Sequence, residues 1–118
     1  MINIIESAVV ARLVNANIDG VGDHVGVTVP ATTPDEYIVV EKTGSDNENH
    51  IATATIAVQS YSKKSMLRAM EINEAVKEAM AQLPYTDDVF SVRLNSDYNF
   101  TDTTTREYRY QAVFNVAY

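Results

Sequence analysis

Two histidines, His24 and His50, are the side chains best suited to proton transfer or metal binding in this chain of 118 residues. Neither has a second histidine within about four residues, the spacing at which a helix presents two imidazoles to one metal ion. Cysteine is absent, which excludes thiolate metal sites, disulfide bonds and a cysteine nucleophile. We therefore interpret both histidines as surface residues of loops.

Acidic side chains gather in the polar run Asp46-Asn47-Glu48-Asn49. The run lacks the alternating ligands and the distal bidentate glutamate of an EF-hand loop, so it indicates a solvated loop. Asp87-Asp88 follows a proline and fits turn chemistry better than a catalytic carboxylate pair. The sequence contains no nucleophile elbow, Walker-type phosphate loop or dinucleotide-binding glycine motif. It therefore predicts a protein that is not an enzyme and that uses no cofactor or metal ion.

The net charge of −7 disfavours a large nucleic-acid-binding face, because an acidic surface repels phosphates. The nine basic residues are dispersed, and Lys63-Lys64 is their only adjacent pair. An acidic protein would still suit a channel through which DNA passes without being gripped. The chain has no run of about 18 apolar residues and no basic-then-apolar start, so we expect neither a membrane span nor a secretory signal.

Helical periodicity marks two segments that must position these side chains. Apolar residues recur every three or four positions over 3–17, with Asn3 able to cap the start. A second stripe of apolar residues covers 63–82, where Ser62 is the predicted cap and Pro84 ends the helix.

Alternating or β-branched runs predict strands in the segments 25–29, 36–43, 51–61, 89–98 and 105–118. Residues 44–50 contain no apolar side chain and predict a protruding loop. In the fourth strand, Phe90, Val92 and Leu94 are expected to face the core. The sequence therefore predicts a single α+β domain over residues 1–118, ordered α-β-β-β-α-β-β. Its antiparallel or mixed sheet would have about five strands, with two helices packed on one face.

The last strand alternates more clearly than any other segment. One of its faces carries Tyr108, Tyr110, Ala112, Phe114, Val116 and Tyr118. Tyrosine suits half-buried and interfacial positions, because its ring is apolar and its hydroxyl needs a partner. We interpret Tyr108 and Tyr110 as core packing and Tyr118 as an interface residue.

The order of these elements resembles that of the tail terminator, or tail-to-head joining, proteins of long-tailed bacteriophages, a group that includes minor tail and tail completion proteins. The stretches that carry the resemblance are VGVTVP with EYIVVEK, then ATIAVQSYSKKSMLRAMEINEAVKEAM, and finally TTREYRYQAVFNVAY. The resemblance implies a virion protein, made in the host cytoplasm, that forms a hexameric ring at the head-proximal end of the tail. Such a ring stops polymerisation of the tail tube and provides the docking surface for the head.

The partners implied by this resemblance are other copies of the chain, the tail tube protein and a head-completion or connector protein. Genomic DNA would pass through the ring without specific binding. The alternatives are a head-completion or neck protein, a tail tube protein, and a small α+β binding module or enzyme.

Three regions are candidates for the assembly contacts. The loop Glu41–His50 would contact the tube or line the lumen, through Glu41, Lys42, Asp46, Glu48 and His50. The start of the second helix, with Lys63, Lys64 and Arg68, would pair with acidic residues of a neighbour. The final strand would lie near a subunit boundary, with Arg106, Arg109 and Tyr118. A solvated loop and solvated charges are the alternative interpretation of each region.

Overall fold

The computed structural model describes residues 4–48, 51–86, 89–105 and 107–118. Along these residues the elements are α1 (Ile5–Asn15), β1 (Val25–Gly26), β2 (Glu36–Glu48), β3 (Ile51–Ser62), α2 (Met66–Ala81), α3 (Leu83–Thr86), β4 (Ser91–Asn99) and β5 (Tyr108–Ala117). The predicted order α-β-β-β-α-β-β is confirmed, and the short helix α3 follows α2 directly. None of the described helices is long and apolar enough to cross a membrane.

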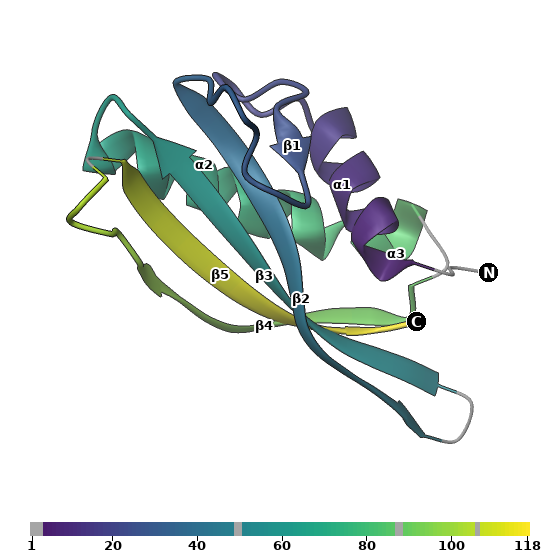
Figure 1. The fold of residues 1–118 in the computed structure, drawn as a ribbon. Coiled ribbons are helices and arrows are strands. Elements are labelled where there is room, and N and C mark those ends of the chain that lie inside the picture. Colours follow the sequence, from purple (N-terminus) through teal and green to yellow (C-terminus); the bar gives the residue numbers. More distant parts are fainter. Residues whose placement is uncertain (1–3, 49–50, 87–88, 106) are drawn as a thin grey trace.

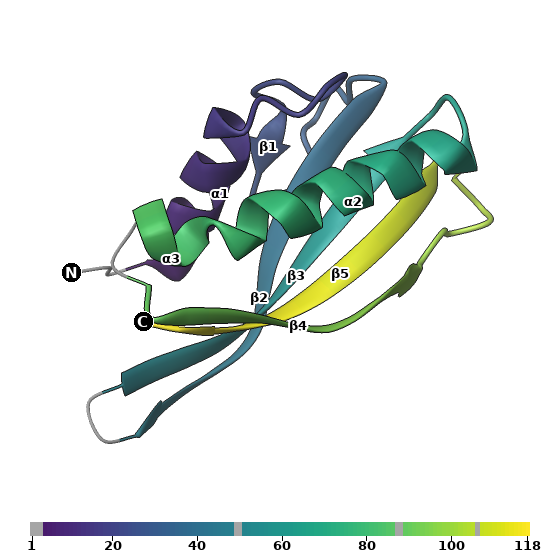
Figure 2. The ribbon, with the colours of Figure 1, turned by 180° about the vertical axis from the view of Figure 1, so that it is seen from behind.

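A five-stranded mixed sheet, in the order β1-β2-β3-β5-β4, forms one layer of the molecule. β1 runs parallel to β2, and all other neighbours are antiparallel. Helices α1 and α2 lie on the same face of the sheet, with α2 crossing β3 and β5 (Figures 1 and 2). The α+β class predicted from the sequence is therefore confirmed. We call the opposite face, which carries none of the described helices, the open face.

The core lies between the helices and the sheet. Helix α1 buries Ile5, Val9 and Leu13, the stripe predicted from helical periodicity, while Ala16 packs against the core from its margin. The other main contributors alternate along the strands or recur along α2: Ile38, Val40, Ala54, Ile56, Val58, Ile72, Val76, Met80, Phe114 and Val116. Burying a side chain of this size contributes about 1.5–3 kcal/mol. Apolar burial thus holds the two layers together.

Helix α2 begins later than the sequence predicts. Ser65, not Ser62, is its N-cap, and the Ser65 hydroxyl accepts the Arg68 N–H at 3.1 Å. Ser62 is instead the buried last residue of β3. Lys63 and Lys64 consequently lie in the connection before the helix. At the other helix, the predicted cap Asn3 lies outside the described residues, and α1 starts after Ile4, whose side chain offers no capping atom.

The predicted loop over residues 44–50 is wrong for its described part. β2 continues to Glu48, and its pairing with β3 runs from Glu36↔Ser62 to Glu48↔Ile51, interrupted by one bulge between Lys42 and Gly44. Both faces of this segment are exposed, which accounts for its polar side chains. The segment is nevertheless a strand, because pairing with β3 gives its backbone groups hydrogen-bond partners. Residues 41–48 of β2 and 51–57 of β3 form a two-stranded ribbon, the projecting ribbon, whose end extends beyond the helices (Figure 1).

β1 is shorter than the predicted strand 25–29. Only Val25 and Gly26 pair with β2, and the chain then leaves the sheet in a loop that contains Pro30 and Pro34. Val27 and Val29 are 55% and 53% exposed in this loop. Because β1 covers only Ile38 and Val39, the rest of β2 has no strand on its outer side in the described structure.

Side-chain directions at the opposite edge differ in part from the prediction. Val92 packs against the core, but Phe90 precedes β4 and is 70% exposed, and Leu94 is 42% exposed. The reason is that α2 crosses β3 and β5 and leaves most of β4 uncovered (Figure 2). On β5, Tyr108 is 38% exposed, which corrects its interpretation as core packing, and Tyr110 is half-buried.

Candidate assembly interface

The projecting ribbon presents the first group of candidate residues. Glu41, Lys42 and Asp46 are exposed on β2. Pairing with β3 places Glu41 and Asp46 on the open face, and Lys42 on the helix face. Glu48 ends β2, its side chain is outside the described structure, and so is His50. The described charges are therefore held on a hydrogen-bonded ladder, which fixes their directions more tightly than a loop would.

The two lysines before α2 differ in their surroundings. The Lys63 ammonium group donates to Thr33 O at 2.8 Å and Thr33 Oγ1 at 2.7 Å, and lies 4.0 Å from Glu107 Oε1. It thus ties the loop after β1 to the end of β3. Lys64 is exposed, and its ammonium group forms no hydrogen bond or ion pair within the described part of the chain.

Arg68 is held inside its own chain. Its Nε donates to Glu36 Oε2 at 3.0 Å and its Nη2 to Glu36 Oε1 at 2.8 Å, a bidentate pair. Nη2 also donates to Asp19 O at 2.8 Å, and the Ser62 hydroxyl donates to Glu36 Oε2 at 2.9 Å. Glu36 is 1% exposed. We call these contacts the Glu36–Arg68 clamp; it joins α2, the start of β2, the end of β3 and the loop after α1.

The clamp changes the acidity of Glu36. Hydrogen bonds from Arg68 lower the pKa of Glu36 below its ordinary value of 4.5; burial opposes this shift, and the Ser62 hydroxyl adds to it. A carboxyl with a lower pKa in the folded than in the unfolded chain stabilises the fold above its unfolded pKa. This contribution disappears as the pH falls through the folded pKa.

We therefore expect the stability difference between wild type and Glu36→Gln to depend on pH. Urea unfolding should give a constant difference above about pH 6, and a shrinking one as the pH falls below about 4.5, because wild type alone loses the ionised carboxylate. Glu78→Gln, at an exposed position on α2, is the control. A Glu36→Gln difference that stays constant into the acid range would contradict this assignment.

A chain of hydrogen bonds crosses the open face. The Arg109 Nη1 donates to Tyr61 OH at 3.0 Å, and Tyr61 OH donates to Gln59 Oε1 at 3.0 Å. Gln59 Nε2 then donates to Gln111 Oε1 at 2.9 Å, and Gln111 Nε2 to Tyr98 OH at 2.6 Å. Both glutamines are 8% exposed. We call this chain the amide ladder; it fixes β3, β5 and β4 side by side without a covering helix.

The sequence interpretation did not identify the amide ladder. The available signal was a glutamine near the middle of each of two long strands, at Gln59 and Gln111, which are direct partners in the β3–β5 pairing. A glutamine can donate and accept at once, so two facing glutamines can satisfy each other.

The candidates on the final strand lie in different settings. Arg109 stacks on Phe100, with the guanidinium carbon 4.4 Å from the ring centroid, and its Nε donates to Phe100 O at 2.8 Å. Tyr118 is half-buried against the core, and its backbone exchanges two hydrogen bonds with Ala52, of 2.8 and 3.0 Å. Arg106 lies outside the described residues. A role for these residues at a subunit boundary stays a prediction.

Two tyrosines stack at the upper end of the open face. The rings of Tyr37 and Tyr61 lie 4.4 Å apart and 9° from parallel. Tyr37 OH donates to Glu107 Oε2 at 2.8 Å, and burial together with Glu107 raises the pKa of Tyr37 above its usual value. The Tyr37 phenol is thus held protonated as a donor, which suits a structural role.

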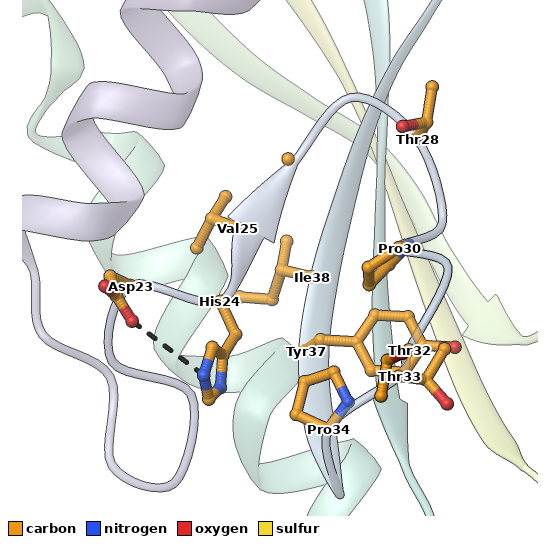
Figure 3. A pocket seen from close by; sticks show the side chains of 11 residues that line it. Asp23, His24, Val25, Thr28, Pro30, Thr32, Thr33, Pro34, Tyr37 and Ile38 are labelled. Atoms are coloured by element: carbon orange, nitrogen blue, oxygen red, sulfur yellow. Dashed lines mark ion pairs between the residues drawn. The ribbon is translucent and has the colours of Figure 1, made fainter.

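A cavity of about 420 Å³ lies between β1, the loop after it and Tyr37 (Figure 3). Two prolines, three threonines and Val25 account for much of its lining, and the exposed His24 lies 3.9 Å from Asp23 at its rim. The predicted surface position of His24 is confirmed. No nucleophile and base are paired in this lining, and nowhere in the described chain do three His, Asp or Glu side chains gather as a metal site.

The fold is similar to that of a chain in a solved structure of the virion of a native gene transfer agent (GTA) particle. The TM-score is 0.66, the sequence identity is 14%, and the match covers 96% of this chain and 92% of that chain. No family model matches the sequence, and no curated protein sequence matches it. At this identity the likeness shows a shared fold.

Proposed function

We propose that the protein is a structural component of a phage-like virion. The observation that carries the proposal is the fold likeness to a GTA virion chain, which extends over nearly the whole length of both chains. The chemistry agrees with a structural role. In the described residues, the buried polar groups of the clamp and the amide ladder form hydrogen bonds with one another.

Within the virion, we propose that the protein forms a hexameric ring that caps the tail tube and offers the head its docking surface. A ring subunit must present two different surfaces to its neighbours. The outer strand β4 and the part of β2 that β1 leaves uncovered are two such surfaces. The projecting ribbon supports a contact with the tube or a position in the lumen. The net charge of −7 suits a channel that DNA crosses without binding.

Purified protein mixed with the tail tube protein of the same virion tests this proposal. We expect negative-stain images to show rings, free or at tube ends, and mean tube length to fall as the ratio of this protein rises, because a capped end adds no further subunits. Filaments of this protein alone would identify a tube protein instead. A stable monomer that leaves tube growth unchanged would contradict the proposal.

Matched charge reversals separate the ribbon from the rest of the surface. Asp46→Lys lies on the ribbon and Glu78→Lys on α2, and both wild-type residues are exposed acids. We expect Asp46→Lys to require a severalfold higher concentration for the same shortening of tubes, and Glu78→Lys to behave as wild type. Equal effects of the two variants would show that the ribbon takes no part in tube capping, either through the tube or through a neighbouring subunit.

A further inference from the structure

The two edges of the sheet are open over long stretches. β4 (Ser91–Asn99) is an outer strand, and on the other side β2 is covered by β1 only at Ile38 and Val39. The segment 41–48 of β2 therefore exposes its outer backbone groups. Unpaired strand edges bind other strands unless charged side chains, proline, bulges or a covering element oppose this. Residues 41–48 of β2 contain Lys42 and a bulge, so a partner strand must accommodate both. β4, SVRLNSDYN, contains neither lysine nor proline.

The strand directions make the two edges compatible. β2, β3, β5 and β4 alternate in direction across the sheet, because each neighbouring pair among them is antiparallel. A second copy placed beside the first, in the same orientation, would bring its β2 next to β4 in antiparallel direction. The alternation would then continue unbroken from one copy to the next.

The two edges also match in shape. The strand pairings, followed across the sheet from β2 through β3 and β5 to β4, align Lys42 with Leu94. These two residues therefore lie in one row of paired residues, at opposite edges of the sheet. Each edge strand has its bulge beside this row, between Lys42 and Gly44 in β2 and between Leu94 and Ser96 in β4. A bulge bends and twists its strand. Because both edges bend at the same level, they can follow each other when paired.

Charges at the edges are complementary. On the open face, the same pairings align Asp46 of β2 with Ser91 of β4, and Glu41 of β2 with Ser96 of β4. Arg93 lies between these two rows along β4. If the next copy is placed beside the first with no shift along the strand direction, Arg93 lies diagonally across from both Glu41 and Asp46 of that copy. Arg93, Glu41 and Asp46 are exposed, and none forms an ion pair within the residues that the structure describes.

We propose that the occupant of the β4 edge is residues 41–48 of a second copy of this chain, paired antiparallel, with Arg93 set between Glu41 and Asp46. The proposal rests on the ring proposed above and deepens it, since it names the contact that joins neighbouring subunits. The pairing also gives Leu94, 42% exposed on the helix face, a neighbour: the aliphatic stem of Lys42 from the next copy.

Cysteine pairs test the contact in the full chain, whose lack of cysteine removes background. Directly opposite residues of antiparallel strands have Cα atoms about 4.5–5.5 Å apart, within the disulfide range of about 4.4–6.8 Å. We expect Asp46→Cys/Ser91→Cys or Glu41→Cys/Ser96→Cys to give a ladder of linked multimers on a non-reducing gel. Asp46→Cys/Arg93→Cys would instead give the ladder if β2 of one copy pairs with β4 of the next at a register shifted by two residues. Glu78→Cys/Ser91→Cys, with one cysteine on α2, should give no ladder.

A charge exchange provides a readout that does not depend on oxidation. Arg93→Glu should raise the protein concentration at half assembly about tenfold, because two attractive cross-strand pairs become repulsive. Glu41→Arg/Asp46→Arg in the same chain should restore it. Rings that still form, without a ladder from any of the three pairs and without rescue, would overturn the edge pairing and leave the ring intact. Absence of any oligomer, with or without tail tubes, would overturn both the pairing and the ring.

Discussion

Replacing Arg68 by alanine is expected to lower the free energy of unfolding by about 3–5 kcal/mol, the usual cost of removing one partner of a buried ion pair. The cost comes from Glu36, which is 1% exposed and would keep a carboxylate with only the Ser62 hydroxyl as its remaining donor from the clamp. The same substitution frees Asp19 O, so the loop after α1 loses its connection to α2. We expect one change on α2 to loosen three segments of the fold.

Urea unfolding of three variants separates the clamp from the surface charges of α2. Glu71→Gln removes the exposed partner of Arg68, at 3.3 Å, and should cost less than about 1 kcal/mol. Glu36→Leu/Arg68→Met replaces both charges by apolar side chains and should recover much of the loss, because no buried charge remains unpaired. Equal stabilities of Arg68→Ala and Glu71→Gln would show that the clamp does not stabilise the fold.

The periodic elements of the fold could be predicted because burial imposes their pattern. The stripe Ile5, Val9 and Leu13 is spaced as a helix with one buried face, and Ala112, Phe114 and Val116 alternate as a strand with one buried face. The α+β class follows from the order of these elements. Where a strand has no buried face, as in the ribbon from Gly44 to Asn47, periodicity carries no signal and the segment resembles a loop.

The polar contacts could not be predicted, because they join residues far apart in the sequence. Glu36 and Arg68 are separated by the whole of β2 and β3, and Arg68 is equally consistent with a solvated charge or with an intersubunit pair. Ser62 resembles a helix cap in sequence, yet it donates to Glu36 within the clamp. Of the candidate assembly residues, the structure shows Arg68, Lys63 and Arg109 with partners in their own chain.

The proposed contact between sheet edges depends on a residue, Arg93, that was not among the candidates chosen from the sequence. Arg93 was not selected from the sequence, because its position was interpreted only as an outward side chain of a strand. Its significance depends on knowing that β4 is an outer strand and that Glu41 and Asp46 share its face of the sheet. Strand order is set by contacts distant in sequence, so this property emerges only in three dimensions.

Gly20→Ala is the second change with a large expected effect, and it acts on the clamp from the opposite side. Gly20 has φ +84°, in the left-handed region that favours glycine, and a Cβ there would collide with Glu36 Oε1 and lie 2.8 Å from Arg68 Nη2. The left-handed backbone alone costs a non-glycine residue about 1–2 kcal/mol. Displacement of the ion pair adds part of the cost of breaking it, so we expect a total of about 4 kcal/mol.

Gly22→Ala is the matched control, since Gly22 has φ +57° and a Cβ there would meet nothing within 4 Å. It should cost only the backbone strain of about 1–2 kcal/mol. If Gly20 matters because it makes room for the clamp, then Gly20→Ala in a Glu36→Ala/Arg68→Ala background, which lacks both colliding side chains, should cost little more than Gly22→Ala, a non-additivity of about 2 kcal/mol. Strict additivity of Gly20→Ala with Glu36→Ala/Arg68→Ala in urea unfolding would instead assign the whole effect of Gly20 to its backbone, because the cost would then be the same with and without the two side chains of the clamp.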